Sequence, residues 1–395
     1  MVVRISFSGV RIVFSSALLF GFGAFVRGYL RHSELAKALT ACENQLPGDG
    51  AATYPQDAIP GGRNVETPYG TIRVYEWGPE DGEKVLLLHG VSAPALTVSG
   101  LADELALRGF RVLMFDLFGR GYSENPAGHD HDIRLYTTQI LLALASSPLP
   151  WLGSESFHLI GYSFGGGLSA AFARFFPATI KSLTLIAPGG LLRQTTTDWK
   201  QRLLYSRGLF PQRLLQYIVR RRLAPPSDPS RPKSSNLSEP SITVPPMRGG
   251  HDTTGGDSFD GAGISRFLPT VTVEQTMAWQ VSQHRGFVPA FMSSMRHGPI
   301  FEQYELWSAL AGKLRSRKLE SEQGRVSPLR GGKVLFVLGQ LDPVIKEEEL
   351  RADANVVLGD DLVEYLVMNA GHELVMTKVH EITTSLVGFW NGQGI

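Results

Sequence analysis

Cysteine is almost absent from this chain, since Cys42 is the only one among its 395 residues. An intramolecular disulfide is therefore impossible, and a cluster of thiolates around a metal ion is excluded. The single cysteine also disfavours a secreted protein that is held together by disulfides. An excess of charge is absent as well, because 38 basic residues face 37 acidic ones. A chain this close to neutrality gives no electrostatic indication of nucleic-acid binding, and we expect no nucleic-acid partner.

Several chemical motifs are also missing. The sequence contains no Gly-rich phosphate loop, no dinucleotide fingerprint, no cluster of metal ligands and no internal repeat. Each of these motifs is a recognisable sign of a cofactor, a metal ion or a repeat architecture. We therefore expect neither a cofactor nor a metal ion. Any chemistry must come from the side chains and backbone of the chain itself.

Acidic residues are absent from the N-terminus up to Glu34, and arginines flank an apolar run at residues 12–26. As a helix this run would be roughly 22 Å long, against about 30 Å for the hydrocarbon core of a bilayer. We interpret residues 1–33 as an uncleaved single-pass anchor that brings residues 12–26 into contact with a membrane. A cleaved signal peptide of the secretory pathway and a mitochondrial presequence are the alternatives.

Short apolar runs that suit buried strands recur from residue 65 onwards. A predicted hairpin at 65–77 is followed by runs at 85–88, 112–115, 157–160, 183–186, 334–338 and 362–367. Helix-compatible stretches lie between most of these runs. The alternation predicts an α/β fold with a mostly parallel sheet that is flanked by helices on both faces. In such sheets the chemistry takes place in loops at the carboxyl ends of the strands.

The alternation of strands and helices stops between the last two groups of strands. A stretch rich in Pro, Ser and Gly at 224–265 has few large apolar residues and is expected to be disordered. Helical patterning lies on both sides of it, at 199–223 and 273–311, which indicates a helical insertion. The predicted division is a terminal segment at 1–33, a linker at 34–64, a core at 65–190 and 331–395, and a helical cap at 191–330.

The segment Gly161-Tyr162-Ser163-Phe164-Gly165 has the form G-x-S-x-G and lies between an apolar run and an alanine-rich, helix-compatible stretch. A serine on a sharp turn from strand to helix is lifted out of the backbone with its Oγ exposed. Glycines on either side leave room for strained dihedrals and close backbone approach. The pattern predicts that Ser163 is a nucleophile.

A serine hydroxyl needs a base that accepts its proton, and the base needs a carboxylate that orients it. His372 is the candidate base, because it follows the predicted strand at 362–367. Asp342 is the candidate acid, because it follows the strand at 334–338. The loop after the strand at 183–186 contains no carboxylate, which favours Asp342.

Acyl transfer also requires backbone N–H donors that face the developing negative oxygen. We expect one donor from Phe164, directly after the nucleophile, and the other from Val91, directly after His89-Gly90. Gly90 permits the turn in that loop. His89 is expected to be a structural hydrogen-bonding residue near the site rather than a second base.

Together these residues resemble the alpha/beta-hydrolase fold superfamily, in the serine hydrolase branch that has a His-Gly oxyanion loop and a helical cap. The matching pieces are His89-Gly90, 116–123, 161–165, 339–342 and Gly371-His372. The resemblance covers about residues 65–395 and implies the same triad and the same oxyanion donors. It also implies that Asp116 is structural and bonds backbone amides near the site. The long insertion and the N-terminal segment depart from the family pattern.

These observations predict a serine hydrolase that cleaves a carboxylic ester, in particular a lipophilic one, with a small-molecule ester or a lipid as substrate. An acyltransferase or a C–C bond hydrolase with the same triad stays open, as does a non-catalytic ligand-binding protein on the same fold. Epoxide hydrolases and haloalkane dehalogenases of this superfamily carry aspartate at the elbow. Ser163 argues against those two activities.

Overall fold

The predicted apolar runs pair into one eight-stranded sheet in the order β1-β2-β4-β3-β5-β6-β7-β8. The strands are β1 (Gly62–Val65), β2 (Ile72–Trp77), β3 (Lys84–Leu88), β4 (Arg111–Phe115), β5 (Phe157–Tyr162), β6 (Ile180–Ile186), β7 (Val334–Gly339) and β8 (Val363–Met368). Strand β2 is antiparallel to both of its neighbours, β1 and β4, and the remaining pairings in this sheet are parallel. The prediction of a mostly parallel sheet is confirmed.

The computed structural model describes residues 54–126, 128–153, 155–194, 212–223 and 270–392. All of them belong to the second of two compact units, Ala52–Ile395. The predicted terminal segment at 1–33, most of the linker and the insert at 224–265 lie outside the described residues. So does the first part of the predicted helical stretch at 199–223.

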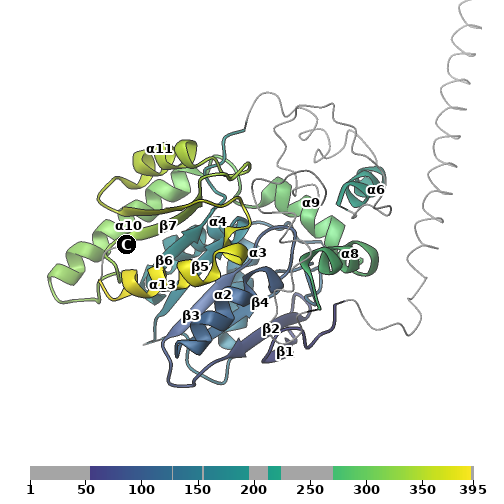
Figure 1. The fold of residues 1–395 in the computed structure, drawn as a ribbon, viewed down its shortest axis with the longest axis horizontal. Coiled ribbons are helices and arrows are strands. Elements are labelled where there is room, and N and C mark those ends of the chain that lie inside the picture. The colour runs from purple at the N-terminus through teal and green to yellow at the C-terminus, as the bar shows by residue number, and fades with distance from the viewer. Residues whose placement is uncertain (1–53, 127, 154, 195–211, 224–269, 393–395) are drawn as a thin grey trace, which may run out of the picture. The chain divides into compact units, whose positions relative to one another are not determined.

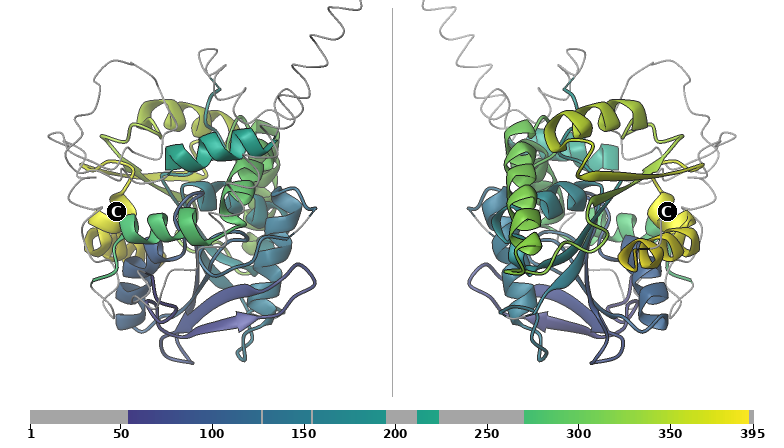
Figure 2. Two further views of the ribbon diagram at one scale, coloured as in Figure 1. Left: turned by 90° about the vertical axis from the view of Figure 1, so that its right-hand side faces the viewer. Right: turned by 90° about the vertical axis from the view of Figure 1, so that its left-hand side faces the viewer.

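Helices cover both faces of the sheet. They are α2 (Leu96–Leu107), α3 (Ile133–Ala145), α4 (Phe164–Phe175), η1 (Pro177–Thr179), α10 (Tyr304–Glu322), α11 (Glu347–Leu358), α12 (Leu374–Thr377) and α13 (Val379–Trp390). Helix α2 packs against α12 and α13, whereas α4 packs against α3 and α10. Figure 2 shows the sheet between these two groups. Trp390 docks α13 on the sheet, because its ring stacks on that of His158 in β5 with centroids 3.8 Å apart.

The insertion between β6 and β7 contributes the helices α6 (Gln212–Leu223), α8 (Val273–Gln283) and α9 (Phe287–His297), which pack against one another. They gather beside one end of the sheet (Figure 1). The chain leaves and re-enters the core at one place, where Leu192 and Phe301 form an isolated parallel bridge. Helix α10 lies within the predicted cap range, but it packs on α4 and so flanks the sheet.

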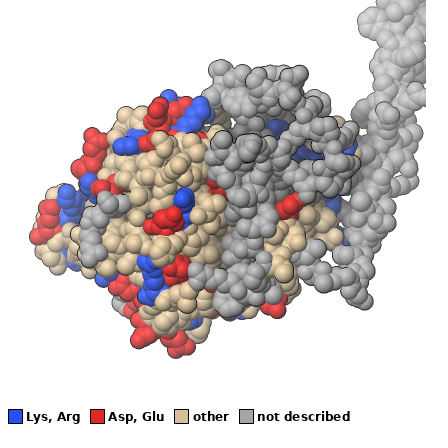
Figure 3. Space-filling model, in the orientation of Figure 1, with Lys and Arg blue, Asp and Glu red and all other residues tan. Residues whose placement is uncertain are grey.

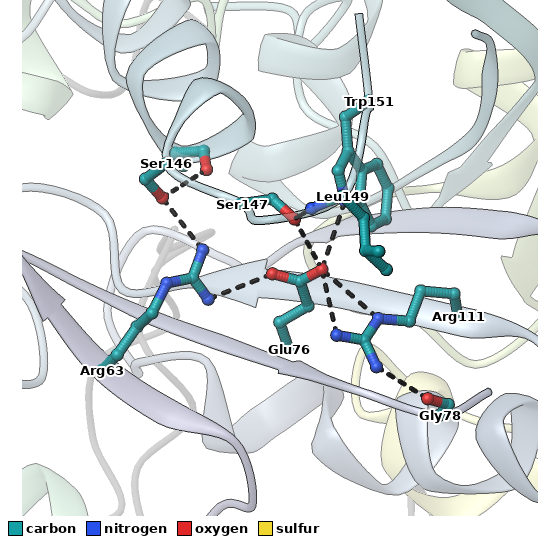
Figure 4. Close-up of polar contacts among 9 residues, drawn as sticks. Arg63, Glu76, Gly78, Arg111, Ser146, Ser147, Leu149 and Trp151 are labelled. Carbon is teal, nitrogen blue, oxygen red and sulfur yellow. Dashed lines mark hydrogen bonds and ion pairs between the residues drawn. The ribbon is translucent and has the colours of Figure 1, made fainter. Parts of the chain in front are cut away.

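The antiparallel edge of the sheet is fastened by a buried carboxylate on β2. Glu76 accepts hydrogen bonds from Ser147 (2.8 Å) and from the indole of Trp151 (3.3 Å). It also pairs with Arg63 on β1 (3.1 Å) and Arg111 on β4 (3.2 Å), as Figure 4 shows. A buried charge is tolerated only when it is paired and hydrogen-bonded. This cluster ties three strands to the loop after α3. It lies at the end of the sheet where the parallel strands begin, opposite the end that carries the candidate site described below.

The prediction of a single-pass membrane anchor is contradicted. Within the ranges that the structure describes, no helix combines the length and apolar character that crossing a bilayer requires. The run at 12–26, and with it the predicted membrane contact, lies outside those ranges. We therefore abandon the prediction of a single-pass anchor.

Acidic and basic side chains lie intermingled on the described face of the molecule that Figure 3 shows. Exposed ion pairs among the described residues include Lys333 with Glu364 (2.9 Å) and Arg315 with Asp361 (3.0 Å). Mixed charge of this kind does not attract a polyanion, because a nucleic-acid footprint is a continuous basic patch. The described part of this face therefore offers no such footprint.

Candidate active site

Ser163 occupies a strained turn between β5 and α4, with φ at +52° and ψ at −117°. Its N–H donates to the carbonyl of Ile186 (2.9 Å), which anchors the turn to β6. Neighbouring elements approach this turn very closely. A Cβ at Gly161 would lie 2.3 Å from the carbonyl oxygen of Gly165, and a Cβ at Gly165 would lie 2.3 Å from that of Leu88. Only glycine fits at both positions, which is why the sequence motif has this form.

Ser163, His372 and Asp342 are joined by hydrogen bonds, although they come from three separate loops. Oγ of Ser163 lies 3.0 Å from Nε2 of His372, and Nδ1 of His372 lies 2.8 Å from Oδ2 of Asp342. The other oxygen of Asp342, Oδ1, accepts bonds from the N–H groups of Val344 (2.7 Å) and Ile345 (2.8 Å). Because a carboxylate only accepts, Nδ1 carries the imidazole proton and the lone pair of Nε2 faces the serine hydroxyl.

Two opposing effects set the pKa of His372. Burial alone would lower it, but the charge and hydrogen bond of Asp342 and the charge of Glu373 outweigh burial and raise the pKa above its ordinary value. The backbone of His372 is also held in place, because the hydroxyl of Tyr162 donates to its carbonyl (3.0 Å). The imidazole is thus oriented, and its protonated form is stabilised.

The predicted oxyanion residues lie beside Ser163. Phe164 is the first residue of α4, so its N–H has no acceptor within the helix. Gly90 precedes Val91 and lies close to the nucleophile, since a Cβ on Gly90 would be 3.6 Å from that of Ser163. His89 is fully buried; it accepts from the N–H of Leu117 (2.8 Å), and its Nδ1 lies 2.8 Å from the carbonyl of Gly90. Burial, with the charge of a nearby arginine, lowers the pKa of His89 to about 3, so this ring is neutral.

Asp116 serves the loops around the site rather than the triad. Its Oδ1 accepts from the N–H of Ala95 (2.9 Å), and its Oδ2 accepts from Tyr75 Oη and the N–H of Tyr122 (both 3.0 Å). Burial raises the pKa of Asp116 to about 6, although these donors act in the opposite direction. Bonds of this kind were expected of a structural aspartate in this position.

Two buried residues near the site escaped the sequence analysis. Arg120 donates to the carbonyl of Val91 (2.9 Å), and Gln280 donates to the carbonyl of Ser92 (3.1 Å). Arg120 lies within the segment 116–123 that was quoted for its family resemblance, so its position was a usable signal. Gln280 had none, because a glutamine in an amphipathic helix suggests a solvent-facing position. Among the described residues, no cluster of His, Cys, Asp and Glu could hold a metal ion.

Comparison with known proteins agrees with this fold. The sequence model of the alpha/beta hydrolase fold matches residues 84–242. An uncharacterized protein of Mycobacterium tuberculosis is 30% identical over 138 residues, which are 35% of this chain and 38% of that protein. Lipase 3 of a Moraxella species is 31% identical over 109 residues, or 28% of this chain and 33% of the lipase. The matches thus span less than half of these relatives.

A solved structure extends the likeness to the whole fold. A membrane phospholipase A described as a bacterial virulence factor superposes with a TM-score of 0.54 at 18% identity, covering 97% of this chain and 98% of the other. At that identity the likeness shows the fold alone. Sheet order, elbow and family match together show that the chain has the alpha/beta hydrolase fold. Two bacterial lipases are among the proteins that it resembles over part of their length.

Proposed function

We propose that the protein is a serine hydrolase that cleaves a carboxylic ester, with Ser163 as nucleophile, His372 as general base and Asp342 as orienting carboxylate. The observation that carries this proposal is the unbroken line of hydrogen bonds from Oδ2 of Asp342 through both ring nitrogens of His372 to Oγ of Ser163. Distances of 2.8 and 3.0 Å are within the range that proton transfer requires. The strained elbow supports the same assignment.

Acylation begins when Oγ of Ser163 attacks the ester carbonyl carbon and its proton passes to Nε2 of His372. The carbonyl oxygen becomes an oxyanion, which the N–H groups of Phe164 and Val91 stabilise in the proposed site. The intermediate collapses when the bond to the leaving alcohol breaks, and that alcohol takes the proton from Nε2. Asp342 stabilises the transient imidazolium without accepting a proton itself.

Deacylation repeats these steps with water as the nucleophile. Water gives a proton to Nε2 of His372 and attacks the acyl carbon, and the oxyanion forms again. The bond between the acyl carbon and Oγ of Ser163 then breaks, and the serine regains the proton. The products are a carboxylic acid and an alcohol, and each proton transfer passes through the one imidazole of His372.

A lipophilic acyl group is the proposed substrate feature. The similarity to lipases supports it, and so does the composition of cap helix α9. That helix buries Phe287, Phe291, Met292 and Met295. A cap helix with this many apolar side chains suits an acyl chain better than a charged group. A series of p-nitrophenyl esters of increasing chain length tests this part of the proposal, and a preference for acetate over octanoate contradicts it.

A fluorophosphonate probe tests the nucleophile directly. We expect the wild-type protein to be labelled at Ser163 and the Ser163→Ala variant to remain unlabelled. The variant Ser282→Ala, at an exposed serine of α8, is the matched control and should be labelled like the wild type. Labelling of Ser163→Ala refutes the assignment, and absence of labelling in the wild type favours a non-catalytic binding protein.

The alternatives with the same triad differ only in the bond or the acceptor. An acyltransferase passes the acyl group to an alcohol, so product analysis with a competing alcohol separates it from a hydrolase. A C–C bond hydrolase leaves simple esters intact and releases a carbanion-derived product instead of an alcohol. Ester turnover that yields free acid in the presence of excess alcohol supports the proposed hydrolase over both.

A further inference from the structure

The backbone that precedes α2 is held by hydrogen bonds at three successive carbonyls. His89 bonds the carbonyl of Gly90 (2.8 Å), Arg120 bonds that of Val91 (2.9 Å) and Gln280 bonds that of Ser92 (3.1 Å). His89, Arg120 and Gln280 are each fully buried, so the donor of each bond is shielded from bulk water.

This arrangement controls the direction of the predicted oxyanion donor. The carbonyl of Gly90 and the N–H of Val91 belong to the same planar trans peptide, so they point in opposite directions. A bond to the Gly90 carbonyl therefore aims the Val91 N–H. The bonds to the next two carbonyls prevent the following peptides from rotating. A donor in an oxyanion hole must lie about 2.7–3.1 Å from the oxyanion, so a small rotation costs much of its effect.

Gln280 links this loop to the cap. It lies on α8, and its Oε1 accepts from the N–H of Gly121 (2.8 Å) while its Nε2 donates to the carbonyl of Ser92 (3.1 Å). One side chain thus bridges the loops that follow β3 and β4. Removal of its amide would leave a buried N–H and a buried carbonyl without that partner. The bridge forms only when α8 lies where it does in this structure.

Arg120 links the same loop to α9 and to the helix of the nucleophile. Its guanidinium donates to Ser294 Oγ and to Tyr136 Oη (both 2.9 Å) in addition to the carbonyl of Val91. The ring of Tyr136 packs edge-on against that of Phe164, with centroids 5.4 Å apart. The described partners of this buried cation are carbonyls and hydroxyls. Its charge is therefore not cancelled by a carboxylate among those contacts, and it favours negative charge nearby.

We infer that Gln280 and Arg120 are positioning residues for the oxyanion loop, so that docking of the cap helices α8 and α9 completes the oxyanion hole. The inference rests on the proposed function. It assigns the cap a part in the rate of the reaction, besides any part in substrate choice. Neither residue touches the substrate in this scheme, since both act through the backbone of residues 90–92.

Kinetics of Gln280→Leu, normalised to the number of reactive sites, test the inference. Active sites are counted by the final stoichiometry of fluorophosphonate labelling, so a misfolded fraction does not lower kcat per site. We expect kcat per site to fall about 10- to 100-fold, below the loss of about 10²–10³ for complete removal of a donor. KM should change less than about threefold, because ground-state binding is not affected. Gln283→Leu, at an exposed position of the same helix, is the matched control and should behave like the wild type.

A trifluoromethyl ketone provides the second measurement, because its tetrahedral adduct with Ser163 carries the oxyanion. Its affinity should fall in parallel with kcat/KM across the variants. Gln280→Met has nearly the volume of glutamine and removes both hydrogen bonds without adding a charge, so it should show the same parallel loss if the Leu variant does not fold. Unchanged kcat per site in a folded variant overturns the inference. Absence of labelling in the wild type overturns the proposed function instead.

Discussion

The Asp342→Asn variant tests the triad sharply, because the structure dictates how the new amide must sit. Oδ1 of Asp342 accepts from the N–H groups of Val344 (2.7 Å) and Ile345 (2.8 Å). Only the amide oxygen of asparagine can accept both bonds, so its NH₂ group must face Nδ1 of His372. Nδ1 must then act as acceptor, and the imidazole proton moves to Nε2, the nitrogen 3.0 Å from Oγ of Ser163.

A base whose lone pair points away from the nucleophile cannot take its proton. We therefore expect kcat to fall by about 10⁴, the loss typical of a triad with the wrong tautomer. That loss corresponds to about 5.5 kcal/mol at about 1.36 kcal/mol per tenfold. The fold should be little affected, because asparagine keeps both backbone hydrogen bonds of Asp342. We expect the free energy of unfolding to change by no more than about 1 kcal/mol.

The assay compares kcat/KM for a p-nitrophenyl ester, per labelled active site, with a thermal melt of each variant. Glu373→Gln is the matched control, because Glu373 also raises the pKa of His372, yet its Oε1 accepts from the N–H of Gly371 (3.1 Å) rather than from the imidazole. Its loss of activity should stay below about tenfold. The reasoning is refuted if Asp342→Asn keeps more than a tenth of wild-type activity, or if the control loses as much.

Three further measurements follow from the site and its surroundings. Only neutral His372 accepts a proton, so kcat/KM should rise with pH through a pKa above about 6.5. Glu373→Gln should move that midpoint to lower pH; an unmoved midpoint contradicts the claim that the charge of Glu373 raises the pKa of His372. Gly165→Ala places a Cβ 2.3 Å from a main-chain oxygen of β3, so it should lower the free energy of unfolding by about 1–3 kcal/mol and the activity by about 10²-fold. Gly312→Ala, on an exposed helix surface, should be neutral or stabilising; equal effects of the two substitutions in urea unfolding and ester assays contradict this. Burial lowers the pKa of His131 to about 3, so as pH falls below about 6.5 this histidine takes up its proton in the unfolded chain first, and the free energy of unfolding should drop by about 1.4 kcal/mol per pH unit. The His131→Phe variant should lack this contribution; identical slopes of unfolding free energy between pH 7 and 5 in the wild type and the variant would exclude it.

The positions of the proposed triad were accessible to sequence reasoning because each depends on a local pattern and one general rule. Ser163, Asp342 and His372 each follow an apolar run, and parallel strands bring such positions to one edge of a sheet. The geometry at the elbow was equally local, since two glycines bracket the serine. The structure adds the bonds that join these side chains, which no local pattern specifies.

Other features depend on contacts between distant parts of the chain. Gln280 and Gly121 are bonded although 159 positions separate them, and an isolated glutamine in a helix carries no sign of such a partner. Arg120 is fully buried, against the strong tendency of arginine to be exposed. Strand β1 begins at Gly62, earlier than the expected hairpin, because an edge strand buries too little to need an apolar run.

The closed base of the insertion governs how freely its length can vary. Leu192 and Phe301 are bridged, the N–H of Gly190 donates to the carbonyl of Ile300 (2.7 Å), and the N–H of Gln303 donates to the carbonyl of Gly190 (2.8 Å). Because these bonds close the insertion at its base, a change in its length alters the entropy of loop closure without altering the register of the sheet. Each doubling of a loop's length costs only about 0.6 kcal/mol. Descendants of this sequence can lengthen or shorten the insertion at small thermodynamic cost, so selection can reshape the cap while the elbow beneath it keeps its geometry.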